Sequence, residues 1–305
     1  MRFIDGAELA RCVPMEAAIA ALDRMFRGEE PPDAPQRTHL PVAGGELLLM
    51  PATGARGTGV KLVTVNPSNA VRGLPLIHGL YALFAPDTLA PVAIVDGAAL
   101  TGLRTAAVSG LATRYLARPD ARRLVIFGAG VQARAHLDAM RAARPIAHTW
   151  IVSRTREKAE RLVAYARDVG LDAAIAGPEA VAEADIVCAC TTSPTPLFDG
   201  SLLREGAHVN AVGAYTRATR ELDDATMRRG RLVVETREAA LAEAGDLIIP
   251  LDAGIISRDD IVADLSALAR GASVRRSPAD ITVFKSVGLA SEDLAVAAAA
   301  VEKAQ

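Results

Sequence analysis

A glycine-rich turn between an apolar run and a helical pattern constrains this chain most. Residues 127–136 read FGAGVQARAH; the run LVIF leads into them and the helical VQARAHLDAM follows. In the spacing G-x-G-x-x-A, Gly128 permits a tight turn, Gly130 lets the backbone approach a phosphate, and Ala133 permits close helix–strand packing. Because the next helix begins with free N–H groups and a partial positive charge, we predict a dinucleotide pyrophosphate site here.

The stretch that this turn opens predicts a doubly wound α/β domain. From residue 124 to 236, short apolar runs such as TWIV, DIVCACT, HVNAVG and RLVVET alternate with helical patterns. Continuous apolar strands separated by helices are typical of a parallel sheet that is covered on both faces. We therefore expect a Rossmann dinucleotide-binding domain over residues 118–283.

The flanking sequence predicts a second domain of another kind. A helical start, MEAAIAALDRMFRG, leads to apolar runs such as GVKLVTV and LYALFA, which Gly, Pro and Asn punctuate. This pattern favours an α+β domain with a largely antiparallel sheet. The helical segment ALTGLRTAAVSGLATRYLAR links this domain to the Rossmann domain. The helical C-terminal segment follows the complete Rossmann pattern, so we expect residues 284–305 to join residues 1–117.

Composition narrows the classes of partner. The 305 residues carry a formal net charge of −2, which gives no strongly basic surface for nucleic acid or an acidic membrane. The three cysteines have neither a disulfide framework nor metal-ligand spacing, so we predict no metal site. The N-terminus lacks the apolar region of a signal peptide, and no apolar run approaches the length of a membrane span. We expect a cytoplasmic protein without a membrane partner.

The end of the second Rossmann strand favours NADP over NAD. An acidic residue about 20 residues after the glycine motif usually binds the ribose 2′-hydroxyl of NAD. Here TWIV runs into Ser153, Arg154 and Thr155. A guanidinium and two hydroxyls suit a 2′-phosphate, and the alternative is that Arg154 stacks on the adenine or points into solvent. NADP is therefore the predicted cofactor, with NAD as the alternative.

Several segments together resemble the ornithine cyclodeaminase/mu-crystallin family. They are LTGLRTAAVSGLATRYLA, FGAGVQARAH, GAHVNAVGA with RELDD, and FKSVGLASED, and their order and spacing match the family. The resemblance implies a Rossmann domain plus a dimerisation and substrate domain, a homodimer, and a nicotinamide cofactor acting on amino acids or cyclic imino acids. Members include ornithine cyclodeaminases, an alanine dehydrogenase and reductases of cyclic ketimines.

The resemblance also implies which residues meet the substrate. Arg37, in PQRTHLPV, and Arg104, in LRTAA, match arginines that bind the substrate carboxylate, and Lys61, in GVKLVTVNP, matches the lysine at the reacting centre. Two guanidiniums can fix the orientation of one carboxylate, and a lysine can polarise an imine or relay a proton. Without the resemblance, Arg37 and Lys61 would be interpreted as solvated charges on strands.

Further residues are candidate contacts of the cofactor. His78, in GLPLIHGLYALF, stands near a position where other members place a polar residue facing the cofactor, and a structural histidine is the alternative. Asp223 and Asp224, after Glu221, are interpreted as acids at a helix start rather than as catalysts. The remaining candidate cofactor residues are Gly128, Gly130, Val131, Gln132, Ser153, Arg154, Thr155, Thr191, Thr105 and Ser286.

One position departs from the cyclodeaminase pattern. Ornithine cyclodeaminases carry an aspartate shortly after NAVG that engages the distal amine of ornithine, whereas NAVGAYTRATREL places Tyr215 there. Tyrosine supplies no anion at neutral pH, and a cyclic ketimine has no distal amine to bind. We therefore predict NAD(P)H-dependent reduction of pyrroline-2-carboxylate or piperideine-2-carboxylate, with Tyr215 at the substrate. The alternatives are ornithine cyclodeaminase or amino-acid dehydrogenase activity and, from another class, a non-catalytic NADPH-dependent binding protein for small ligands.

Overall fold

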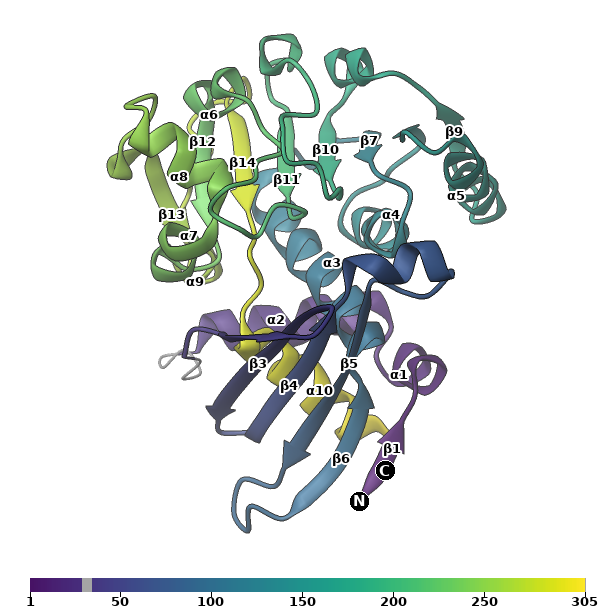
Figure 1. Ribbon diagram of the computed structural model, residues 1–305. Coiled ribbons are helices and arrows are strands. Elements are labelled where there is room, and N and C mark those ends of the chain that lie inside the picture. Colours follow the sequence, from purple (N-terminus) through teal and green to yellow (C-terminus); the bar gives the residue numbers. More distant parts are fainter. Residues whose placement is uncertain (29–34, 305) are drawn as a thin grey trace. The chain divides into compact units, whose positions relative to one another are not determined.

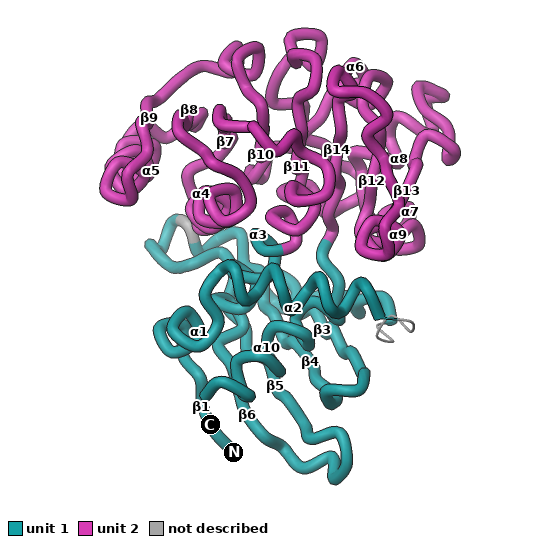
Figure 2. The backbone as a smooth tube through the Cα atoms, turned by 180° about the vertical axis from the view of Figure 1, so that it is seen from behind, with its two compact units in different colours: residues 1–107, 288–305 teal, residues 108–287 magenta. Residues whose placement is uncertain are grey.

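The computed structural model describes residues 1–28 and 35–304, and the chain divides into two compact units (Figures 1 and 2). Unit 1 comprises residues 1–107 and 288–305, and unit 2 comprises residues 108–287. The sequence places the limits at 117/118 and 283/284 instead. The first observed division falls inside helix α3 (Gly97–Leu116), and the second follows strand β14 (Ile281–Lys285), because that strand is hydrogen-bonded into the sheet of unit 2.

Unit 1 is built on a six-stranded sheet in the order β1-β6-β5-β4-β3-β2. Every pairing is antiparallel except that of β1 with β6, as the largely antiparallel prediction requires. The chain forms hairpins here because Gly and Pro punctuate runs of alternating residues, whose side chains point to opposite faces of the sheet. The strands are β1 (Arg2–Ile4), β2 (Thr38–Val42), β3 (Gly45–Gly54), β4 (Gly57–Val65), β5 (Ile77–Phe84) and β6 (Pro91–Asp96).

One face of this sheet is covered by helix α10 (Ala290–Ala304), which crosses β3, β4 and β5 and also packs against helix α2 (Met15–Arg27) (Figure 1). The many alanines of α10 let its backbone approach the sheet closely, and most of the helix is buried. Along the central strands, buried residues alternate with residues that are half-buried or exposed. Unit 1 also contains α1 (Gly6–Cys12), the first part of α3 and the 3-10 helix η1 (Pro67–Arg72).

Unit 2 contains an eight-stranded parallel sheet in the order β13-β12-β14-β11-β10-β7-β8-β9. The chain runs from β7 to β9 in one direction and then returns to the other side of β7 with β10 and β11. This reversal is the topological switch point at which doubly wound sheets bind ligands. The strands are β7 (Arg123–Phe127), β8 (His148–Val152), β9 (Asp172–Ile175), β10 (Ile186–Ala189), β11 (His208–Ala211), β12 (Gly230–Val234), β13 (Ile261–Asp264) and β14.

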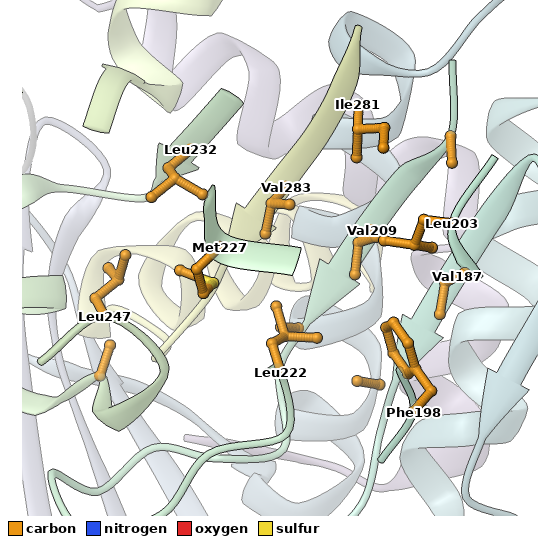
Figure 3. Packing of buried hydrophobic residues seen from close by; sticks show 14 of the residues in the cluster. Val187, Phe198, Leu203, Val209, Leu222, Met227, Leu232, Leu247, Ile281 and Val283 are labelled. Atoms are coloured by element: carbon orange, nitrogen blue, oxygen red, sulfur yellow. The ribbon is translucent and has the colours of Figure 1, made fainter. Parts of the chain in front are cut away.

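Helices and short turns connect these parallel strands. They are α4 (Val131–Ala143), α5 (Arg156–Asp168), α6 (Asp224–Arg229), α7 (Arg237–Glu243), α8 (Gly245–Asp252), α9 (Leu265–Ala269) and the 3-10 helices η2 (Pro178–Glu183), η3 (Gly200–Leu202) and η4 (Arg258–Asp260). An apolar core on one side of the sheet joins strands to helices, and burial of each large side chain stabilises the fold by about 1.5–3 kcal/mol. Figure 3 shows its central residues, which include Val187, Phe198, Val209, Leu222, Met227, Leu232 and Val283.

Among the described residues, no helix is both long and apolar enough to cross a membrane. Within residues 1–28 and 35–304, no group of three or more His, Cys, Asp or Glu side chains is arranged to hold a metal ion.

Candidate active site

The glycine motif lies at the switch point of the sheet in unit 2. Gly128 follows β7 with φ of +103°, and a Cβ there would lie 2.6 Å from the carbonyl oxygen of Cys190, so the turn requires glycine. A Cβ on Gly130 would have no atom within 4 Å. Gly130 precedes α4, and no side chain of the described residues caps this helix. A tight turn, an open second glycine and a helix N-terminus without a side-chain cap fit a dinucleotide pyrophosphate.

The side chains in the first turn of α4 differ in their exposure to solvent. Val131 is 74 % exposed, which is unusual for a large apolar side chain at the start of a helix that packs on a sheet. Gln132 is half-buried, and Ala133 is fully buried, as the close-packing role of the motif's last position requires. Three consecutive residues thus pass from solvent to core.

The predicted adenosine-binding stretch follows β8, the strand beside β7. Gly128 donates its N–H to the carbonyl of Val152 at 2.8 Å, which ties the end of β8 to the glycine turn. Ser153 Oγ accepts the N–H of Thr155 at 3.2 Å and holds the loop before α5 in a compact turn. The side chain of Arg154 is exposed at this point. The structure therefore brings Ser153, Arg154 and Thr155 to the same sheet edge as the glycine motif.

Three more predicted residues follow strands of unit 2. Thr191 lies after β10, and a Cβ on Gly128 would be 3.5 Å from its Cγ2 atom. Its N–H and its hydroxyl both donate to Glu221 at 2.7 Å. Tyr215 is half-buried after β11. Ser286, after β14, is buried, and its hydroxyl donates to Glu235 at 2.6 Å, so this hydroxyl serves the interior of unit 2.

Unit 1 contains a buried cluster of opposite charges. The Nζ atom of Lys61 lies 2.7 Å from Oδ2 of Asp293. Arg104 donates from Nε to Oδ1 of Asp293 at 3.1 Å and from Nη1 to Oε2 of Glu292 at 3.0 Å. All four residues are at most 4 % exposed. Two cations facing two carboxylates form a neutral group, which offsets the large cost of removing each charge from water.

The pKa of Lys61 is lowered in this cluster. Burial lowers the pKa of its ammonium to about 8, and the positive charge of Arg104 contributes to this shift, whereas Asp293 opposes it. Tyr81, the cross-strand partner of Lys61, is also buried, and burial raises the pKa of its hydroxyl, so Tyr81 stays neutral. A lysine with a pKa of about 8 can donate and accept protons under physiological conditions.

Gly288 connects Arg37 to this cluster. The carbonyl of Gly288 accepts Nη2 of Arg37 at 2.7 Å. A Cβ on Gly288, whose φ is +81°, would overlap with the guanidinium of Arg104. The backbone of one residue thus lies against both arginines. The structure brings Arg37, Lys61 and Arg104, which are predicted to act on the same substrate, together in unit 1.

His78 and Thr105 are also in unit 1. His78 pairs with Thr64 across β5 and β4, and it is exposed. Because side chains alternate along a strand, His78 points to the sheet face opposite to that of Lys61 and Tyr81. Thr105 is buried in α3 beside Arg104 in sequence. The structure therefore does not bring His78 to the charged cluster.

Comparison with known proteins identifies the family of this chain. The model of the ornithine cyclodeaminase/mu-crystallin family matches residues 7–305. This chain belongs to that family. The Delta(1)-pyrroline-2-carboxylate reductase of Bacillus cereus is 39 % identical over 315 residues, which cover 100 % of this chain and 97 % of that protein.

Solved structures of similar proteins share the fold. That of Thermococcus litoralis Delta(1)-pyrroline-2-carboxylate reductase in complex with NADH and L-proline has a TM-score of 0.94 at 35 % identity, and covers 100 % of this chain and 97 % of that one. An archaeal alanine dehydrogenase dimer with bound NAD has a TM-score of 0.93 at 30 % identity, with 99 % and 95 % covered. The predicted family and the predicted Rossmann-type α/β fold are confirmed.

Sequence reasoning missed the acids that hold the cationic residues of this family member. FKSVGLASED indicates the family, but the ion pairs of Glu292 and Asp293 were not predicted. A signal was present, because two adjacent acids open a helix that is otherwise rich in alanine, and acids on a buried helix need cationic partners. The sequence also showed no sign of the hydrogen bonds of Glu221. Asp223 caps α6 by accepting the N–H of Thr226, which agrees with the prediction of an acid at a helix start.

Proposed function

We propose that this protein reduces small cyclic ketimine carboxylates, such as pyrroline-2-carboxylate or piperideine-2-carboxylate, with NAD(P)H. The observation that carries the proposal is the buried cluster of unit 1, in which Lys61, with a pKa of about 8, lies with Arg37 and Arg104. Two guanidiniums match a carboxylate, and a lysine with a lowered pKa matches an imine nitrogen that must gain a proton. The 39 % identity to a Delta(1)-pyrroline-2-carboxylate reductase supports the same reaction.

The residues of the chain divide the work of this reaction. When bound, the nicotinamide supplies a hydride, and Gly128, Gly130 and the start of α4 would hold the pyrophosphate. Arg104 is fixed by its bonds to Asp293 and Glu292, so it meets the substrate carboxylate in a set orientation. Lys61, held by Asp293, gives a proton to the ring nitrogen as the ring carbon accepts the hydride. The product is the cyclic amino acid.

The neighbourhood of Tyr215 supports a ketimine over ornithine. The two acids nearest in sequence that could bind a distal ammonium, Glu221 and Asp223, are already used within unit 2. Glu221 is fully buried and accepts hydrogen bonds from Thr191 and the loop after β11, and Asp223 caps α6. An ammonium without a partner in a partly dry site costs several kcal/mol. We therefore assign Tyr215 to the substrate side, where it favours a ring without a distal charge.

One assay tests this function directly. NADPH or NADH oxidation with pyrroline-2-carboxylate is compared with the formation of proline and ammonia from ornithine in the presence of NAD. We expect imine reduction to be much faster. Comparable rates on ornithine would overturn the proposal, and activity with neither substrate would favour a binding protein. As a sharper arm, Tyr215→Asp should gain ornithine binding and slow the reduction of the cyclic imine, since its apolar ring would face a new anion.

NADPH is proposed as the preferred cofactor. Similar proteins of known structure hold NADH or NAD, so a nicotinamide dinucleotide is common to the group. In this chain the stretch after β8 carries Arg154, exposed between two hydroxyl residues, where an NAD enzyme usually carries an acid. The guanidinium is free of any hydrogen bond or ion pair to the rest of the described chain, and it can pair with a 2′-phosphate.

A homodimer is proposed because one face of the sheet in unit 1 is apolar and not fully covered. Leu49, Leu62 and Leu80 are direct cross-strand neighbours on this face; the first two are half-buried, and Leu80 is 40 % exposed. Leu40 extends the row on β2 and is 48 % exposed. Contiguous apolar surface of this kind marks an interface. The related archaeal alanine dehydrogenase is a dimer, which supports a second copy as the partner.

Light scattering tests the dimer. We expect the mass of two chains at micromolar concentration, and Leu62→Glu should shift it to one chain while leaving dinucleotide binding in place. A wild-type mass of one chain would count against the interface.

We also propose that the enzyme acts in the cytoplasm, on a soluble metabolite.

A further inference from the structure

A buried carboxylate joins the ends of two neighbouring strands in unit 2. Oε1 of Glu221 accepts the N–H and the hydroxyl of Thr191, both at 2.7 Å. Oε2 accepts the N–H of Gly213 at 2.7 Å and that of Ala214 at 3.3 Å. Thr191 follows β10, and Gly213 and Ala214 follow β11. One fully buried side chain thus binds both loops at the carboxyl edge of the sheet.

The two loops touch each other at this point. A Cβ on Gly213 would overlap with the carbonyl oxygen of Thr191 and would lie 2.6 Å from Oε1 of Glu221. No side chain fits there, so glycine is required by the close approach of the loops and not by its backbone angles. The position of Thr191 is therefore coupled to that of Gly213 and of the residues that follow it, including Tyr215.

An ion pair between Lys285 and Asp246 fixes the backbone at Glu221. Lys285, at the end of β14, lies 2.8 Å from Oδ2 of Asp246 and donates to the carbonyl of Ala214 at 2.5 Å. Oδ1 of Asp246 accepts the backbone N–H groups of Glu221 and Leu222 at 2.7 and 2.9 Å. Burial raises the pKa of the Glu221 carboxyl, and Lys285 and the Thr191 hydrogen bonds act in the opposite direction. The negative charge of Asp246 adds to the rise, whereas the four donors that face the carboxyl oxygens favour the ionised form.

This network stands where a dinucleotide lies in such sheets. Ligands of doubly wound folds bind outside the carboxyl ends of the strands at the switch point, here between β7 and β10. Thr191 borders that point, because a Cβ on Gly128 would contact the backbone of Cys190 and Cγ2 of Thr191. The glycine motif is the pyrophosphate end of the site, so the loops after β10 and β11 are placed for the nicotinamide end.

We propose that Glu221 is a positioning residue, whose carboxylate fixes the loops after β10 and β11 against the nicotinamide half of the dinucleotide. Asp246 holds the backbone N–H of Glu221, and Lys285 binds both Asp246 and the carbonyl of Ala214, so these two residues fix the chain around the carboxylate. Four donors face Glu221, and a carboxylate accepts all four. A glutamine offers one oxygen and turns its NH₂ group toward two further N–H donors, so it cannot hold both loops. The inference rests on the proposed use of a nicotinamide dinucleotide.

The test separates the two halves of the cofactor. Affinities of Glu221→Gln for ADP-ribose, which lacks nicotinamide, and for NADH are measured by titration calorimetry. We expect the affinity for ADP-ribose to stay unchanged and the advantage of NADH over ADP-ribose to shrink. With pyrroline-2-carboxylate, kcat should fall by roughly 10²-fold, the cost of a misplacement of about 1 Å, and the isotope effect with 4-deuterated NADH should rise as hydride transfer becomes limiting. The matched control is Glu183→Gln, because Glu183 is an exposed acid of the same unit. This variant should change neither the two affinities nor kcat nor the isotope effect.

Outcomes that contradict the role of Glu221 differ from those that contradict the proposed substrate. Equal losses of affinity for ADP-ribose and NADH would overturn the inference, because they indicate a general loss of structure in unit 2, and an unchanged kcat would overturn it too. Should Glu221→Gln fail to fold, Thr191→Val removes one of the four donors and should lower kcat several-fold with ADP-ribose binding intact. If the wild type binds NADH but does not reduce cyclic imines, the proposed substrate is wrong, and the ratio of the two affinities still decides the role of Glu221.

Discussion

The two units build their candidate sites from different materials. The dinucleotide site of unit 2 is made mainly of backbone, with Gly128 and Gly130 between a strand and a helix. The cluster of unit 1 is made of full charges on Lys61, Arg104 and Asp293, all buried. A backbone site needs only a local conformation, whereas a buried charge needs a partner that the rest of the fold supplies. The two kinds of site should therefore respond to substitution in different ways.

The largest expected effect comes from removing Lys61, the proton donor that we propose in unit 1. Lys61→Met should lower kcat for imine reduction by about 10²–10⁴-fold, the usual contribution of a general acid. The affinity for NADH should be unchanged, because the glycine motif belongs to unit 2. Single-turnover oxidation of NADH and a titration of NADH measure the two quantities. If NADH affinity fell and kcat did not, the proposal that unit 1 supplies the proton while unit 2 binds the dinucleotide would be wrong.

Arg154→Ala tests the one charged contact that we assign to the cofactor. A charge-assisted bond to the 2′-phosphate contributes about 1.5–3 kcal/mol, so the Kd for NADPH should rise by roughly 10- to 150-fold. The Kd for NADH should hardly change. Titrations of both cofactors against wild type and variant give the comparison, and equal losses for the two would show that Arg154 does not contact the phosphate.

A pair of glycine variants separates fold from ligand in unit 2. Gly128→Ala places a side chain at positive φ against the carbonyl of Cys190 and should lower the free energy of unfolding by about 1–3 kcal/mol. Gly130→Ala meets no neighbouring atom, so it should leave Tm unchanged and weaken NADH binding alone. Thermal melts with and without NADH measure both effects. If Gly130→Ala left NADH affinity at the wild-type value, the pyrophosphate would not approach at this residue.

The smallest expected effect is a shift in a pH profile. Burial lowers the pKa of Lys61 to about 8, and we propose its ammonium as the proton donor, so kcat/KM for imine reduction should fall as pH rises above about 8. The negative charge of Asp293 raises this pKa. Asp293→Asn should therefore move the alkaline limb to lower pH. The profile of hydride transfer is recorded for both proteins, and a limb at the same pH would remove Lys61 as its source.

Much of unit 2 could be predicted from its sequence for a physical reason. Alternation of apolar strands with helices, and glycines at a tight turn, are local requirements that each segment meets by itself. The glycine motif, the parallel sheet and the α+β character of the flanking part follow from such patterns. The family resemblance also named Arg37, Lys61 and Arg104, which the fold brings together although they are far apart in the chain.

Only the tertiary structure decided what these residues touch. Asp293 reaches Lys61 because the C-terminal helix α10 returns to the sheet of unit 1. Lys285 reaches Asp246 because β14, the last strand in sequence, inserts between β11 and β12. His78 is a candidate cofactor contact from its sequence context, and the pleat of β5 places it on the sheet face opposite to Lys61. Pairing of buried charges depends on where distant segments meet, and no local pattern of residues encodes that meeting.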